Sequence, residues 1–215
     1  MTQLPNASGI RALLFDFGGV LAEEGFHKGL EELGREQGLD PKGLAQAGMD
    51  AVYDSGFVLG QGSAGEFWRL LRERTGLVGD PRTLSRRILA GFTLRPWMLE
   101  AVDRLRQAGY LTAILSDQTH WLDTLVERHG LDRYFDRIYN SYHLGKGKRD
   151  PSVFDDVVRD LGVPPREVLF IDDNPANVTR AETRGLRGWP YRNREEFEQL
   201  LARLLAAAPS RLSIT

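Results

Sequence analysis

Residues 10–21 read Ile-Arg-Ala-Leu-Leu-Phe-Asp-Phe-Gly-Gly-Val-Leu. The first six residues are mostly apolar, and the run stops at Asp16, with Gly18 and Gly19 close behind. A short apolar run that is closed by glycines is typical of a buried strand that ends in a turn. This stretch therefore predicts a first strand with a carboxylate directly after it.

The second half of the chain continues with alternating strands and helices. Apolar or β-rich runs at 110–115, 137–140, 168–171 and 188–191 alternate with helical stretches at 96–109, 119–129, 151–161, 175–184 and 195–206. This alternation is typical of a parallel sheet that is covered by helices on both faces. The sequence therefore predicts an α/β fold, with a tail that frays after Pro209.

Residues 22–92 differ in character from the rest. Helical pieces at about 26–38, 42–54, 64–75 and 82–90 are separated by Gly and Pro, without a strong strand signal. We expect a small helical domain at 22–92, inserted into a core that is made of residues 1–21 and 93–215.

One glycine pattern in this helical stretch is misleading. Residues 60–65, Gly-Gln-Gly-Ser-Ala-Gly, fit the dinucleotide-binding pattern, but they do not follow the first strand as such a site requires. We interpret Ser63 to Glu66 instead as a capping box that opens the next helix.

The composition excludes several classes of protein. The 215 residues include no cysteine, which rules out disulfides and thiolate metal sites. The four histidines lack the close spacing of zinc ligands, and no apolar run is long enough for a membrane span. A net charge of −2 gives no support to a nucleic-acid surface. We expect a cytoplasmic protein with neither nucleic-acid nor membrane partners; its oligomeric state is not predicted.

Polar side chains follow three of the predicted strands. Asp16 follows the first, Ser116 and Asp117 follow the second, and Asp172 and Asp173 follow a later one. Ligands of open parallel sheets bind outside the carboxyl ends of the strands. Carboxylates gathered there repel one another unless a cation lies between them, and oxygen ligands without His or Cys suit Mg²⁺. The sequence therefore predicts a magnesium site at this edge.

These signals occur in an order that resembles the haloacid dehalogenase-like (HAD) superfamily. The four motifs are Phe15-Asp-Phe-Gly-Gly-Val-Leu21, Ile114-Leu-Ser-Asp117, Lys148-Arg-Asp-Pro-Ser-Val-Phe154 and Phe170-Ile-Asp-Asp-Asn-Pro-Ala-Asn-Val178. The resemblance is strongest to the branch of sugar-phosphate phosphatases and of the phosphatase domain of soluble epoxide hydrolases. It implies a Rossmann-like core, a helical cap at 22–92 and a Mg²⁺-dependent phosphatase that acts on a small phosphorylated metabolite, such as a sugar phosphate.

The resemblance also implies how the metal is held. Asp16 is expected to be the nucleophile that forms an aspartyl-phosphate, and also a metal ligand. Asp173 is expected to bind Mg²⁺ directly, and the Gly18 carbonyl with its backbone oxygen. Asp172 is expected to act through water or from behind the direct ligands.

Three further residues are expected to contact the substrate. Ser116 would hydrogen-bond a phosphoryl oxygen, and Lys148 would place positive charge near the transition state. Asp117 would face the substrate. Lys146 is a rival for the role of Lys148, but the order Lys-Arg-Asp-Pro matches the family's Lys-Pro-Asp-Pro and favours Lys148.

Two positions depart from the family pattern. Gly18 stands where most HAD phosphatases have a second Asp, which protonates the leaving group. We therefore hypothesise a substrate with a good leaving group, such as an anomeric or acyl phosphate. Asp117 stands where the branch usually has Asn; a solvent-facing helix N-cap is the favoured interpretation and a replacement acid the alternative. His27 and His120 are further candidate proton donors, although each is more typical of a surface residue.

Two other functions stay open from the sequence. A 2-haloacid dehalogenase would use the same Asp nucleophile on carbon without a metal, but its last motif generally lacks the Asp172-Asp173 pair. A catalytically silent binding protein with the HAD fold is supported only by Gly18 and Asp117. The aromatic residues Phe26, Tyr53, Phe57 and Trp68 could line a pocket, but core packing is favoured for most of them.

Overall fold

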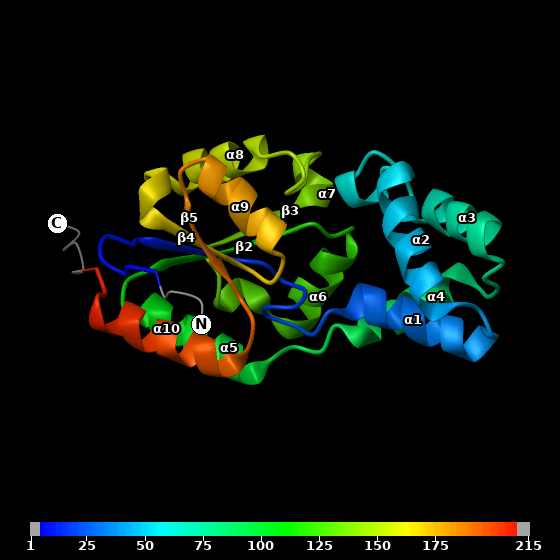
Figure 1. Cartoon of the computed structure of the whole chain (residues 1–215), viewed down its shortest axis with the longest axis horizontal. Helices are drawn as coiled ribbons and strands as arrows, with labels where there is room; N and C mark the ends of the chain where they lie inside the picture. Colours follow the sequence, from blue (N-terminus) through cyan, green and yellow to red (C-terminus); the bar gives the residue numbers. More distant parts are fainter. Residues whose placement is uncertain (1–4, 210–215) are drawn as a thin grey trace.

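The computed structural model describes residues 5–209 and contains a five-stranded parallel sheet (Figure 1). The strand order is β3-β2-β1-β4-β5, and every neighbouring pair is parallel. The strands are β1 Ala12–Phe15, β2 Leu111–Ser116, β3 Arg137–Asn140, β4 Val168–Asp172 and β5 Arg187–Pro190. The predicted α/β fold is confirmed; the predicted fraying after Pro209 lies outside the described residues.

Helices cover both faces of the sheet (Figure 1). Because alternate side chains of a strand point to opposite faces, β1 places Leu13 and Phe15 in one apolar cluster and Ala12 and Leu14 in another. The first cluster includes residues of α5 Pro96–Gln107, α6 Trp121–His129 and α10 Arg194–Ala206, and the second includes residues of α8 Ser152–Leu161 and α9 Pro175–Thr183.

Of the five α-helices between β1 and β2, the first four form the helical insertion (residues 22–92), at one end of the sheet in Figure 1. They are α1 Gly25–Gln37, α2 Pro41–Asp54, α3 Ala64–Thr75 and α4 Pro81–Gly91. Each begins at a side chain that accepts a hydrogen bond from a first-turn N–H, and these capping residues are Glu24, Asp40, Ser63 and Asp80. Capping satisfies N–H groups that have no partner inside the helix, which explains where each helix starts.

The two connections between the sheet and the helical insertion run side by side. Ala22 and Leu94 form an isolated antiparallel bridge. The backbone N–H of Arg95 donates to the carbonyl of Leu21 at 2.9 Å, and its guanidinium donates to the carbonyl of Gly19 at 2.6 Å. Both connections therefore pass from the core to the insertion at the same place, beside the turn that follows β1.

The helical insertion also contacts the core on its other side. The short helix η1 Phe57–Leu59 meets α7 Ser141–Leu144, where the Ser141 hydroxyl donates to the carbonyl of Val58 at 2.7 Å. Neither of these elements is predicted from the sequence, nor are the turns η2 Leu131–Arg133 and η3 Pro165–Glu167. One turn of helix is too short to produce a periodic pattern, so tertiary contacts define such elements.

Two local predictions need correction. The capping box at α3 is only half formed, because Ser63 accepts from the Glu66 N–H at 3.2 Å while the Glu66 carboxylate pairs with Arg69. α6 begins at Trp121 instead of 119, since the Thr119 hydroxyl accepts from the Trp121 N–H at 3.2 Å and ends the preceding loop. Within residues 5–209 no helix has both the length and the apolar character needed to span a bilayer.

We expect Gly60→Ala to destabilise the protein more than the matched change Gly76→Ala. Both glycines have a left-handed backbone, with φ of +66° and +74°. An Ala at position 76 meets nothing within 4 Å and should cost only the left-handed strain of about 1–2 kcal/mol. A Cβ at position 60 would lie 2.1 Å from the Tyr142 carbonyl oxygen, so the helical insertion must shift from α7.

Urea unfolding of the two variants measures this difference. Equal losses of unfolding free energy would contradict a close approach of the backbone at Gly60.

Candidate active site

The parallel register brings three carboxylates to one edge of the sheet. Phe15 pairs with Ile171, so Asp16 follows β1 at the level where Asp172 ends β4, and Asp173 comes next. Each carboxyl group offers an oxygen atom, and these atoms lie within 4.8 Å of one another. Asp16 and Asp172 are buried, whereas Asp173 is exposed. The arrangement is a candidate site for one metal ion.

Lys148 reaches into this cluster from the loop before α8. Its Nζ lies 2.8 Å from Asp16 Oδ1 and 2.7 Å from Asp172 Oδ2, and the residue is only 2% exposed. The rival Lys146 points elsewhere, because it pairs with Asp156 and donates to the Ser152 hydroxyl at 2.9 Å. Of the two lysines, Lys148 alone lines the cleft at the carboxylates.

The charges in this cluster do not balance. Burial raises the pKa of Asp16 to about 8, with Asp172 and Asp173 adding to the shift and Lys148 opposing it. Asp173 is exposed at its surface, but partial loss of solvent around its carboxyl group raises its pKa, and Asp172 adds to the shift. Burial disfavours the charge on Lys148, but Asp16 and Asp172 outweigh that effect and raise the pKa of the lysine. One ammonium faces three carboxylates, so a divalent cation fits the site, both by oxygen ligands and by charge.

Two adjacent glycines shape the loop after β1 in different ways. Gly19 has φ of +84°, and a Cβ there would lie 2.1 Å from Asp173 Oδ2. Gly19 therefore allows Asp173 to approach the loop. Gly18 does not have a positive φ, and a Cβ there would make only an ordinary contact at 3.6 Å with the Phe92 ring. Steric reasons thus require glycine at position 19 but not at position 18.

The residues after β2 have different surroundings. Ser116 ends β2, is buried and lines the cleft. Asp117 also lines the cleft, but the favoured interpretation as a helix N-cap is wrong, since α6 starts only at Trp121. Asp117 Oδ1 accepts from the Lys148 backbone N–H at 2.8 Å, and Oδ2 accepts from the Tyr53 hydroxyl at 3.0 Å. This carboxylate therefore links the core to the helical insertion.

Motif four contributes two amides that hold Asp172 in place. The Asn174 N–H donates to Asp172 Oδ1 at 2.7 Å, and Asn177 Nδ2 donates to Asp172 Oδ2 at 3.1 Å. Asn174 also caps α9 as predicted, because its Oδ1 accepts from the Ala176 N–H at 3.0 Å. The supporting role of Asn177 is not predicted, although its place in the motif could have indicated it.

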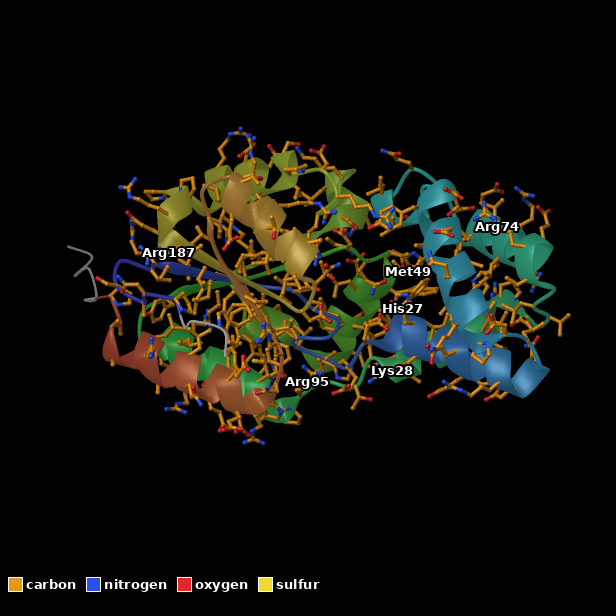
Figure 2. The ribbon with its side chains drawn as sticks, in the orientation of Figure 1. His27, Lys28, Met49, Arg74, Arg95 and Arg187 are labelled. Atoms are coloured by element: carbon orange, nitrogen blue, oxygen red, sulfur yellow. The ribbon has the colours of Figure 1, made fainter. Side chains whose placement is uncertain are left out.

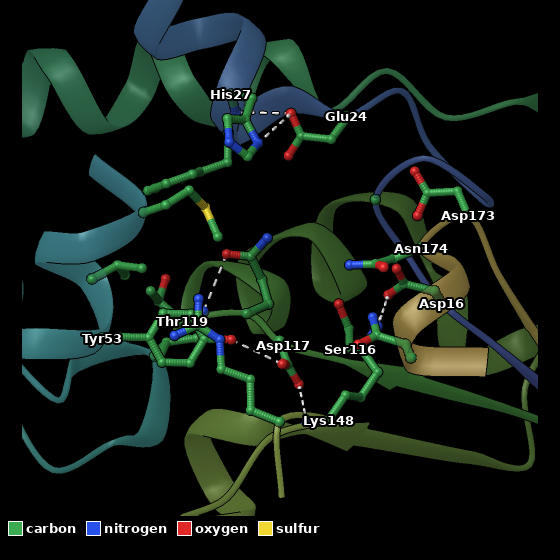
Figure 3. A pocket seen from close by; sticks show the side chains of 18 of the residues that line it. Asp16, Glu24, His27, Tyr53, Ser116, Asp117, Thr119, Lys148, Asp173 and Asn174 are labelled. Carbon is green, nitrogen blue, oxygen red and sulfur yellow. Dashed lines mark hydrogen bonds and ion pairs between the residues drawn. The ribbon is translucent and has the colours of Figure 1, made fainter. Parts of the chain in front are cut away.

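The carboxylates and Lys148 lie in a cleft of about 450 Å³ between the core and the helical insertion (Figure 3). Its apolar wall comes from the insertion: Phe26, Met49, Val52, Val58 and Phe92. Its polar wall includes residues that are not singled out from the sequence: Glu24, Gln118, Thr119, Arg149 and Arg180. The cleft can therefore hold a small molecule with one polar and one apolar side.

Some of the remaining candidate residues line the cleft, and others do not. Phe26 and Tyr53 line the cleft, whereas Phe57 and Trp68 are buried in the apolar core. His27 lines the cleft and lies where the insertion meets the core (Figure 2). His120 is not part of the lining; its ring packs 5.3 Å from that of Phe57.

Comparisons with known proteins bear on this site. The family model for haloacid dehalogenase-like hydrolases matches residues 10–182. The chain is 27% identical to the D-ribitol-5-phosphate phosphatase of Bacteroides thetaiotaomicron, over 91% of this chain and 98% of that protein. A match to a drimenol cyclase of Aspergillus calidoustus, 34% identical over 77 residues, covers 36% of this chain and only 15% of that protein.

Two solved structures have the same fold. A HAD-like hydrolase from Porphyromonas gingivalis is 30% identical, with a TM-score of 0.69, over 92% of this chain and 98% of that one. A HAD family enzyme from Bacteroides thetaiotaomicron, solved with magnesium and inorganic phosphate, is 22% identical with a TM-score of 0.71, over 89% and 98% of the two chains.

We expect Lys148→Met to destabilise the metal-free protein by about 3–5 kcal/mol, because removing one partner of a buried ion pair leaves the other charge uncompensated. Lys146→Met is the matched control in the same loop. It removes a more exposed ion pair and should cost about 1 kcal/mol or less. Chemical denaturation in the presence of a chelator measures both. A smaller loss for Lys148→Met than for Lys146→Met would contradict the importance of the buried lysine.

Proposed function

The chain belongs to the haloacid dehalogenase-like hydrolase family, and from this membership and its site we propose that it is a Mg²⁺-dependent phosphatase of a small phosphorylated metabolite. The observation that carries the proposal is the cluster of three carboxylates around one buried lysine at the cleft. Such a cluster suits an anionic substrate only together with a cation. The phosphatase activity of the full-length relative from Bacteroides thetaiotaomicron supports the same choice.

The residues that would hold the metal are those that offer carboxylate or carbonyl oxygen atoms at the cleft. Asp16, Asp173 and the Gly18 carbonyl would hold Mg²⁺, with Asp172 acting through water. Bound there, the ion would offset the repulsion between the Asp16 carboxylate and a phosphate dianion. Lys148 keeps Asp16 and Asp172 in position and adds positive charge beside the transferring phosphoryl group.

In the proposed reaction Asp16 is the nucleophile. One carboxylate oxygen forms a bond to phosphorus while the ester P–O bond breaks. The electron pair of the broken bond stays on the alcohol oxygen, which takes a proton from water. The product is an aspartyl-phosphate. A water molecule then hydrolyses it to inorganic phosphate and restores the carboxylate. Ser116 would donate a hydrogen bond to a phosphoryl oxygen during both steps.

We propose that the helical insertion is the cap domain of this enzyme. It supplies the apolar wall of the cleft, including Phe26 and Met49, and so covers the side opposite the carboxylates. A wall that excludes water strengthens the electrostatic interactions of the lysine and the carboxylates with substrate.

We expect Asp16→Asn to lower the Mg²⁺-dependent hydrolysis of p-nitrophenyl phosphate about 10³-fold or more, since the amide cannot form the phosphoryl ester. Asp132→Asn, an exposed site outside the cleft, is the matched control and should keep the wild-type rate. EDTA should abolish the wild-type activity and Mg²⁺ should restore it.

Other outcomes of this assay identify the alternative functions. Release of chloride from 2-chloropropionate that survives EDTA would indicate a dehalogenase. A chain without Mg²⁺-stimulated activity on any phosphate ester would indicate a binding protein.

We expect the wild-type enzyme to favour phosphate esters with good leaving groups, because position 18 has no acid to protonate the alcohol. Gly18→Asp should raise the rate on glycerol 1-phosphate more than the rate on p-nitrophenyl phosphate, since general acid catalysis contributes about 10²–10⁴-fold for a poor leaving group. The space at Gly18 accepts a Cβ, so the variant should fold. Gly18→Ala is the control without a carboxylate. Equal wild-type rates on alkyl and activated phosphates would refute the hypothesis.

A further inference from the structure

Arg149 is a cation in the cleft that the proposed reaction does not use. It follows Lys148 directly and replaces the proline of the family's Lys-Pro-Asp-Pro motif. Arg149 is an exposed residue that lines the cleft. Unlike Lys146 and Lys148, Arg149 takes part in no ion pair within residues 5–209. A guanidinium without an acidic partner at the wall of a binding cleft is available to an anionic ligand.

The position of this guanidinium is fixed by an aromatic ring. Its central carbon lies 3.5 Å from the centre of the Tyr53 ring, which comes from α2 of the helical insertion. Stacking of this kind restricts a side chain that would otherwise lose much conformational freedom on binding, and it leaves the N–H edge of the fork available.

Tyr53 is in turn held by the core. Its hydroxyl donates to Asp117 Oδ2 at 3.0 Å, and Asp117 Oδ1 accepts from the Lys148 N–H at 2.8 Å. Burial and the neighbouring Asp117 raise the pKa of Tyr53, so the phenol remains a donor. A Cβ on Gly147 would lie 2.7 Å from Asp117 Oδ1, so the glycine makes room for this contact. Asp117 therefore acts as a positioning residue for Tyr53 and for the backbone of the Lys148 loop.

The stacked pair lies away from the phosphoryl-binding end of the cleft. In Figure 3, Tyr53 is on the side of α2, whereas Asp16 and Asp173 are on the opposite side of the cavity. Gln118 and Thr119 line the space together with these residues. A substrate whose phosphoryl group lies at Asp16 would extend toward Tyr53 and Arg149.

We propose that Arg149, stacked on Tyr53, forms an anion subsite, and that the natural substrate carries a second anionic group, a carboxylate or another phosphate, at the end distant from the scissile phosphate. The planar fork of arginine donates two parallel hydrogen bonds to either group, which explains why this position gains from an arginine. The inference rests on the proposed function for the placement of the first phosphate and adds a substrate class to it.

The direct test is ligand binding without turnover. In the Asp16→Asn variant with Mg²⁺, calorimetry compares 3-phosphoglycerate with glycerol 1-phosphate, which differ in the carboxylate. We expect 3-phosphoglycerate to bind at least tenfold more tightly, and Arg149→Gln to remove most of this preference. Arg149→Lys should keep part of it, because it retains the charge but not the fork. Arg159→Gln, which removes an exposed arginine of α8, is the matched control and should keep all of it.

Two results would overturn the inference. One is the absence of a preference for the more charged ligand both in this pair and between fructose 1,6-bisphosphate and fructose 6-phosphate, and the other is a preference that survives Arg149→Gln. If Arg149→Gln weakens both ligands equally, the arginine does not recognise the second anionic group, and the subsite does not exist.

A second pair of ligands separates the two possible anions. Fructose 1,6-bisphosphate and fructose 6-phosphate differ in a phosphate, so a preference confined to this pair identifies a bisphosphate, and one confined to the first pair identifies a carboxylate. Wild-type hydrolysis of p-nitrophenyl phosphate is measured alongside. Activity without an anion preference rejects the subsite but keeps the proposed function, whereas a preference without activity keeps the subsite and rejects the phosphatase.

Discussion

The contact on which the rest of the site depends is that of Lys148 with Asp16 and Asp172. A buried ammonium lies within 2.8 Å of two carboxylates, which come from the ends of two neighbouring strands. Two carboxylates this close repel each other, and the ammonium of Lys148 opposes the resulting rise in the pKa of Asp16. Since one lysine faces three carboxyl groups, the arrangement that pairs charges at this edge is also a candidate site for a cation. Stability and chemistry thus have the same cause.

Much of the fold follows from the sequence because its elements are well delimited. The apolar run before Asp16 and the alternation after Arg95 are local signals, and they yield the sheet and its helices. The order of polar residues after the strands also indicates which side chains come together, because parallel strands end at one edge. The roles of these side chains in catalysis stay predictions.

What the sequence does not reveal depends on contacts between distant segments. Asp117 looks like a helix N-cap when only its neighbours in the sequence are considered. Its actual partners, Tyr53 and Lys148, lie 64 and 31 residues away. Arg149 and α7 are missed for the same reason. Their surroundings are created by the docking of the helical insertion, and neither a motif nor a periodicity encodes that contact.

The paired crossing between the core and the helical insertion has a mechanical consequence. Both connections pass through the Ala22–Leu94 bridge, and Arg95 fastens them to the carbonyl of Gly19, which lies against Asp173. A rotation of the insertion about these connections would break the Tyr53–Asp117 and Ser141–Val58 hydrogen bonds and widen the cleft on the side of Tyr53, while moving the Gly18–Gly19 turn very little. Substrate would then enter and products would leave by movement of the helical insertion, while the carboxylate cluster stays in place.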